Sequence, residues 1–182
     1  MTRVKLSSLT VIFLAVTLVS FLAACRSNHD PAGNGPLSSG VDGHLERGFD
    51  CVPGGEGQTF AGQTFTNHGN IPVILDRIVL LRASNERIIG SYAMPGQRLI
   101  GIVPWPPKYR HMPPTWKDRQ PVRGFRVTSG KSFNMVLGTE AIVAGRATAK
   151  GMLIYYHDSR GAYVAKNLVG MIIAASKHGC HR

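Results

Sequence analysis

The chain is poor in acidic residues, with 10 Asp and Glu against 21 Lys and Arg among its 182 residues. They are scattered along the sequence, so no pair of carboxylates suited to acid–base hydrolysis is evident. Zincin and nucleophile-elbow motifs are also missing, and Gly130-Lys131-Ser132 lacks the glycine spacing of a phosphate loop. We therefore expect that the protein is not an enzyme and that it holds no cofactor and no metal ion. The main acidic positions are Asp76, Glu86, Asp118, Glu140 and Asp158.

Long amphipathic helices and internal repeats are absent too. The one stretch rich in helix formers, residues 139–149, is interrupted by Gly145 and preceded by Gly138. Instead, segments rich in Val, Ile, Phe, Tyr and Thr are separated by Gly, Asn, Asp and Ser at short intervals, which is typical of strands and turns. This pattern predicts strands over residues 58–66, 72–82, 87–94, 98–103, 122–128, 131–137, 147–157, 162–166 and 169–175.

The expected fold is all-β: a single antiparallel immunoglobulin-like sandwich of about seven to nine strands, with a small barrel as the second choice. Two turns support it, Asn67-His68-Gly69-Asn70 and Asp158-Ser159-Arg160-Gly161, because Asn, Asp and Gly adopt the conformations that hairpin turns need. The first of these turns resembles one in exported bacterial sandwiches. The final hairpin resembles that of small uncharacterised bacterial lipoproteins, a likeness that implies a fold and a location but no activity.

The first 25 residues have the pattern of an export signal. Arg3 and Lys5 precede a stretch without charge over residues 6–21, and Leu22-Ala23-Ala24-Cys25 follows. The last four residues resemble the lipobox of bacterial lipoproteins, which implies cleavage before Cys25 and attachment of a diacylglyceryl group to its sulfur. An ordinary secretory signal fits less well, because Leu22 suits the −3 position poorly. An uncleaved membrane helix fits less well because hydroxyl residues interrupt a run at the short limit for a bilayer.

The domain organisation expected from this pattern has three parts. Residues 1–24 are a lipoprotein signal peptide, residues 25–50 are the lipidated cysteine with a disordered tether, and residues 51–182 are the β-sandwich domain. The tether is predicted because Gly, Ser, Asn and Pro dominate it and apolar residues are few. Lipidation would leave Cys51 and Cys180, one near each end of the domain, and an exported protein with two such cysteines is expected to join them in a disulfide.

A metal site is the competing interpretation of the C-terminus. His178-Gly179-Cys180-His181 places three possible ligands within four residues. Once Cys180 is in a disulfide, only two histidines near the chain end remain, so we expect no functional metal site there.

Residues 104–126 combine features that the rest of the chain lacks. They hold six of the eleven prolines, both tryptophans and six cations beside a lone Asp118. Prolines stiffen an extended loop, and cations beside aromatic rings suit anionic or sugar ligands. The predicted binding loop therefore comprises Trp105, Lys108, Tyr109, Arg110, Trp116, Lys117 and Arg119. The alternative is that the tryptophans cover an open end of the sandwich and the cations are merely solvated.

Together these features predict a lipid-anchored binding or sensing module at the extracytoplasmic face of a bacterial cell membrane. The alternative is a structural or assembly accessory that packs on a membrane protein. The excess of Lys and Arg favours an anionic envelope polymer, lipid headgroups or a membrane protein as partner, although a basic surface could also serve solubility alone. An exported protein does not ordinarily meet nucleic acid, so we expect no nucleic-acid partner.

Overall fold

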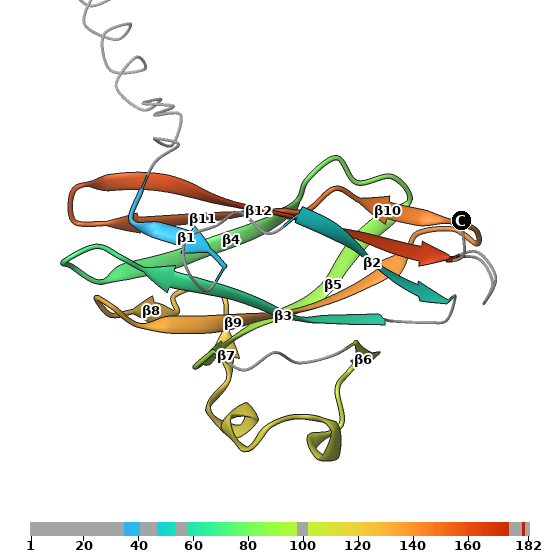
Figure 1. The fold of residues 1–182 in the computed structure, drawn as a ribbon, viewed down its shortest axis with the longest axis horizontal. Coiled ribbons are helices and arrows are strands. Elements are labelled where there is room, and N and C mark those ends of the chain that lie inside the picture. Colours follow the sequence, from blue (N-terminus) through green and yellow to red (C-terminus); the bar gives the residue numbers. More distant parts are fainter. Residues whose placement is uncertain (1–34, 41–46, 54–57, 98–101, 175–179, 181–182) are drawn as a thin grey trace, which may run out of the picture. The chain divides into compact units, whose positions relative to one another are not determined.

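The computed structural model describes residues 35–40, 47–53, 58–97, 102–174 and 180, which contain twelve strands and two short 3₁₀ helices. These residues lie within one unit, which runs from Pro31 to Arg182. The strands form two sheets that face each other, so the prediction of an all-β sandwich is confirmed (Figure 1).

The first sheet has the strand order β1-β3-β9-β5-β7, with β6 also paired to β3. Its members are β1 (Leu37–Ser39), β3 (Gln58–Asn67), β5 (Glu86–Pro95), β6 (Val103–Pro104), β7 (Gln120–Pro121) and β9 (Ser132–Ala141). All of its pairings are antiparallel.

The second sheet has the order β10-β12-β11-β4-β8, with β2 also paired to β12. Its members are β2 (Arg47–Pro53), β4 (Val73–Leu80), β8 (Arg126–Val127), β10 (Ala147–Ala149), β11 (Met152–Asp158) and β12 (Gly161–Ala174). The β2–β12 pairing is parallel, and the others are antiparallel.

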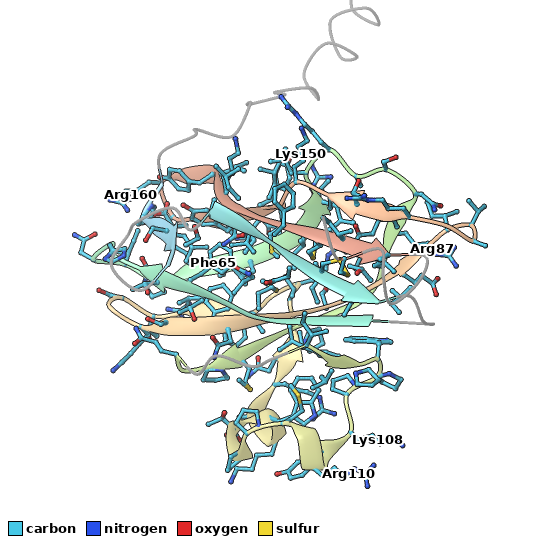
Figure 2. All side chains as sticks on the ribbon, turned by 45° about the vertical axis from the view of Figure 1, so that its right-hand side comes forward. Phe65, Arg87, Lys108, Arg110, Lys150 and Arg160 are labelled. Carbon is cyan, nitrogen blue, oxygen red and sulfur yellow. A yellow bond between two sulfur atoms is a disulfide. The ribbon has the colours of Figure 1, made fainter. Side chains whose placement is uncertain are left out.

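The core lies between the two sheets and follows the alternation of each strand. In β11, Met152, Ile154 and Tyr156 are buried and their neighbours are less so, as expected for a strand with one face on the core. From the first sheet, Phe65 and Phe133 stack with ring centroids 5.6 Å apart. Figure 2 shows Phe65 in the interior between the layers.

Several predicted strands are confirmed and others are corrected. The segments predicted at 58–66, 72–82 and 87–94 match β3, β4 and β5 closely. The segment at 147–157 is two strands, because Gly151 takes a φ of 136° between them. The segments at 162–166 and 169–175 are one strand, β12, while residues 98–101 lie outside the described part of the chain.

The expected disordered tether at 25–50 is wrong at two places. Leu37 in β1 is 4% exposed and belongs to the core, and its backbone N–H donates to the hydroxyl of Tyr156 at 3.1 Å. Strand β2 begins at Arg47 and pairs along β12. Both strands were missed because each lies among Gly, Ser and Asp residues and gains its stability from pairing with a distant strand. Residues 1–34, including Cys25, lie outside the described residues.

The predicted disulfide between Cys51 and Cys180 is confirmed. The two Cα atoms are 5.7 Å apart, and the bridge closes a sequence separation of 129 residues. Cys51 lies in β2, which runs beside β12, so the bridge fixes the chain that follows β12 to its neighbouring strand.

Candidate binding site

The predicted binding loop lies across the outer face of the first sheet. It leaves β6 at Pro104, passes through the 3₁₀ helices η1 (Tyr109–His111) and η2 (Pro114–Asp118), and returns to the sheet at β7. Because β6 pairs with β3 and β7 pairs with β5, both ends of the loop are held by hydrogen bonds to the same sheet. Figure 1 shows the loop as a separate layer beside β3, β9 and β5.

Trp105 is seated on two glycines of the sheet. A Cβ atom built on either Gly90 of β5 or Gly138 of β9 would overlap the indole ring. The absence of a side chain at these two strand positions is therefore what allows the ring to reach the backbone of the sheet. Tyr92 stacks beside the same ring, with centroids 5.9 Å apart.

Trp116 forms a second small core with residues of the sheet. It is 4% exposed and packs with Met94, Met112 and Val136, all of them buried. The ring of Tyr92 meets Trp116 edge-on at 5.5 Å. A buried tryptophan in such a cluster contributes mainly to stability.

Arg119 closes this layer from the solvent side. Its guanidinium carbon lies 4.4 Å from the centroid of the Trp116 ring and 5.5 Å from that of Tyr92. One of its Nη atoms donates to the backbone oxygen of Trp116 at 3.1 Å. Arg119 thus packs over the aromatic rings, as cation–π geometry favours.

The structure therefore separates the seven predicted loop residues into two groups. Trp105, Trp116 and Arg119 pack onto the sheet, while Lys108, Tyr109, Arg110 and Lys117 are exposed at the tip. Figure 2 shows Lys108 and Arg110 at this tip, remote from the sandwich. The alternative to binding was that the two tryptophans cover an open end of the sandwich. In the structure they cover the outer face of the first sheet instead.

A cavity of about 480 Å³ opens at the base of the loop. Its apolar lining includes Phe125 and Val127, both buried, together with Pro95. Two cations, Arg126 and Lys131, line it as well. The remaining lining residues are Gly96, Gln97, Gln120, Thr128, Gly130 and Ser132.

The charge in this cavity is uncompensated. No acidic residue lines it, and among the described residues no carboxylate lies within ion-pair distance of Arg126 or Lys131. Both side chains are exposed, so they can turn toward a ligand without loss of an existing pair. An apolar floor with a few convergent polar groups is the usual form of a ligand pocket.

One wall of the cavity is fixed by hydrogen bonds. Gly130 takes a φ of 67°, and its N–H donates to the backbone oxygen of Asn67 at 2.8 Å. Asn67 is fully buried, and its side-chain amide donates to the backbone oxygens of Ile71 at 2.9 Å and Val127 at 3.1 Å. The Nε2 of Gln97 donates to the Ser132 hydroxyl at 2.7 Å, and both residues line the cavity. The turn that carries Lys131 is therefore held in place.

The sequence does not reveal this cavity. Gly130-Lys131-Ser132 has the pattern of a tight turn, which the structure confirms, but the turn's position opposite Gln97 and Gln120 depends on strands far apart in the chain. The one signal in the sequence is Arg126, which ends the proline-rich segment.

Two further sets of titratable groups lie outside the cavity. Nδ1 of His157 lies 2.9 Å from Oδ1 of Asp76 on the outer face of the second sheet, and both side chains are partly exposed. Glu86 is 5% exposed, and burial raises the pKa of its carboxyl, an effect that the neighbouring Thr139 hydroxyl partly opposes. Among the described residues neither Glu86 oxygen has a hydrogen-bond partner with good geometry.

The described part of the chain contains no group of three His, Cys, Asp or Glu side chains arranged to hold a metal ion. It also contains no helix long and apolar enough to span a bilayer.

Among the solved structures that this chain resembles, two illustrate how distant the likeness is. The PapD-like domain 7 of human CEP192 has a TM-score of 0.37 at 8% identity, covering 84% of this chain and 95% of that one. The secreted serine protease VesC from Vibrio cholerae has a TM-score of 0.36 at 14% identity, covering 76% of this chain. The chain spans only 22% of the length of VesC. Neither likeness is close enough to carry an argument about activity. No protein-family model and no curated protein matches the sequence.

Proposed function

We propose that the protein is a non-catalytic binding module of the bacterial cell envelope, anchored through a lipidated Cys25 on the extracytoplasmic face of the membrane. Its ligand is an anionic envelope polymer, of which one charged group enters the cavity at the base of the loop. The observation that supports this most is the pair of unpaired cations, Arg126 and Lys131, in a cavity with an apolar floor and no acidic lining.

The disulfide supports the proposed location. A bridge between Cys51 and Cys180 persists in oxidising compartments and is rare in the reducing cytosol. The anchor itself follows from the lipobox pattern at Leu22-Ala23-Ala24-Cys25. Two acyl chains, at about 0.8 kcal/mol for each buried CH₂, suffice for stable anchoring.

The position of β1 shortens the chain between anchor and domain. From Cys25 to Gly35, where the described structure begins, ten residue steps span at most about 35 Å when fully extended. An anchored domain would therefore stay close to the lipid headgroups, within reach of polymers attached at the membrane surface.

Labelling of cells with a radioactive fatty acid tests the anchor. The full chain should take up label and the Cys25→Ser variant should not, because the variant lacks the acceptor sulfur. Label retained in Cys25→Ser would overturn this part of the proposal.

The cavity is tested by titrating the full chain with a poly(glycerol phosphate) of defined length and, separately, with a polyuronate. We expect the variant Arg126→Gln/Lys131→Gln to weaken binding about tenfold, because each exposed ion pair with the ligand contributes up to about 1 kcal/mol, or about fivefold. The matched control is Lys108→Gln/Lys117→Gln, which removes the same charge from the loop tip and should change binding less than about twofold.

All four substituted cations are exposed, so neither double variant should change the melting temperature appreciably. Equal weakening by both variants would show that only net charge matters and would contradict a site in the cavity. Weakening by the tip variant alone would place the site on Lys108 and Lys117 instead.

A further inference from the structure

The outer face of the second sheet carries a second hollow, on the opposite side of the sandwich from the loop. It measures about 410 Å³ and is lined by Gly48, Phe49, Leu81, Arg82, Lys150, Lys166 and Leu168. Figure 2 shows Lys150 on one side of the molecule and the loop tip with Lys108 on the other. The cavity at the base of the loop shares no residue with this hollow.

An exposed aromatic ring on the edge strand β2 lines this hollow. Phe49 of β2 is 57% exposed, and it pairs in register with Gly170 of β12. A Cβ on Gly170 would overlap the Phe49 ring, so the ring lies against the backbone of β12 on the outer face of the sheet. Asp50, the next residue, pairs with the buried Met171 and so faces the other side of the sheet.

Three cations line the same hollow as Phe49. Arg82, Lys150 and Lys166 are exposed, and no acidic residue lines the hollow. Within the described ranges no carboxylate lies at ion-pair distance from any of the three. Three cations beside an exposed apolar ring are complementary to a surface whose outer layer is anionic and whose interior is hydrocarbon.

The apolar character continues across the sheet. Lys166 of β12 pairs with Leu153 of β11, and Leu153 pairs with Val79 of β4. Val79 is 39% exposed, and Leu153 is half-buried. Long Lys and Arg side chains can lie along such a surface while their charges reach outward.

We propose that this face docks on the surface of a lipid bilayer rich in anionic phospholipid. Phe49 enters the headgroup layer, and Arg82, Lys150 and Lys166 pair with lipid phosphates around it. Each cation near such a surface contributes about 1 kcal/mol, or about fivefold in binding. The docked face would leave the loop and its cavity directed away from the membrane, accessible to a ligand.

The experiment uses the full chain with Phe49→Trp, mixed with vesicles whose acyl chains carry bromine as a fluorescence quencher. Trp105 and Trp116 lie on the opposite face and provide the background, measured in the unsubstituted chain. We expect the added fluorescence to be quenched in vesicles containing phosphatidylglycerol and not in vesicles of phosphatidylcholine alone. The quenching should disappear in about 0.5 M salt, which reduces the screening length to about 4 Å.

Two matched variants assign the effect to this face. Arg82→Gln/Lys150→Gln/Lys166→Gln should lower the docked population roughly 100-fold and abolish quenching. Lys108→Gln/Arg110→Gln/Lys117→Gln removes the same charge from the loop tip on the other side and should leave quenching unchanged. Equal quenching in both lipids, or equal loss in both variants, would overturn the proposal.

Flotation of the same vesicles distinguishes a failure of docking from a failure of the proposed lipid anchor. A lipidated chain floats with either lipid, whatever its orientation. A chain without the anchor should float only with phosphatidylglycerol, and quenching of the fluorescence added by Phe49→Trp in those vesicles would still support docking. A chain that floats with both lipids but shows no quenching contradicts docking and leaves the anchor intact.

Discussion

Replacement of Trp116 by alanine tests whether the loop layer is part of the folded core. The side chain is only 4% exposed, and it contacts Met94, Met112 and Val136 on one side and Arg119 on the other. Truncation of a buried tryptophan lowers the free energy of unfolding by about 3–5 kcal/mol. The loss is the sum of the transfer free energy of the removed atoms and the cost of the cavity that remains. For a domain of this size each kcal/mol lowers the melting temperature by about 2–4 °C.

We therefore expect Trp116→Ala to lower the melting temperature by roughly 10–15 °C, measured by circular dichroism or calorimetry. Tyr109→Ala is the matched control, since Tyr109 lies in the same loop and is 59% exposed. Its truncation should change the free energy of unfolding by less than about 0.5 kcal/mol. A melting temperature for Trp116→Ala within about 2 °C of that control would refute the packed layer.

A second substitution probes the same layer from the strand beneath it. Gly138→Ala would place a methyl group where Trp105 now lies, so the ring must move, and overpacking of this kind costs about 1–3 kcal/mol. Gly48→Ala is the control, because a Cβ there meets no atom within 4 Å. Gly48→Ala should leave the free energy of unfolding unchanged or raise it slightly, because alanine reduces the conformational entropy of the unfolded chain. Similar stability in the two variants would contradict the seating of Trp105 on Gly138. Two further predictions concern stability. The Cys51–Cys180 bridge closes a separation of 129 residues, for which the chain-entropy relation gives roughly 5 kcal/mol. Cys51→Ser/Cys180→Ser should therefore melt well below the oxidised protein, and free thiols in the native protein would contradict the bridge. For Glu86, burial raises the pKa above its ordinary value of 4.5. The folded state thus holds this proton more tightly than the unfolded chain, and its stabilising effect is complete below about pH 4.5 and is lost as the pH rises through the raised pKa. In urea unfolding, Glu86→Gln should have a higher free energy of unfolding than the natural protein at pH 7. The difference should disappear toward about pH 4. An advantage independent of pH would exclude a buried ionised carboxylate.

The sequence alone determined the fold class of this protein. Strands β3, β4, β5 and β9 could be located because their β-branched and aromatic residues are bounded by turn residues, and turn chemistry is a local property. The hairpin at Asp158–Gly161 is an example, since the Asp158 carboxylate accepts hydrogen bonds from the backbone N–H groups of Arg160 at 2.7 Å and Gly161 at 3.2 Å. The disulfide could be predicted because the expected lipidation of Cys25 leaves two cysteines to pair.

Only the tertiary structure decided what depends on segments far apart in the chain. Leu37 looks like part of a polar linker, and it is buried because β1 pairs with the distant strand β3. Trp105 and Trp116 carry the same local signal whether they bind a ligand or cover a sheet. The seating of Trp105 was decided by Gly90 and Gly138, which leave room for an indole ring only once β5 and β9 lie side by side. Arg82, Lys150 and Lys166 are likewise ordinary surface residues in the sequence, and they line one hollow because β11 pairs with both β4 and β12.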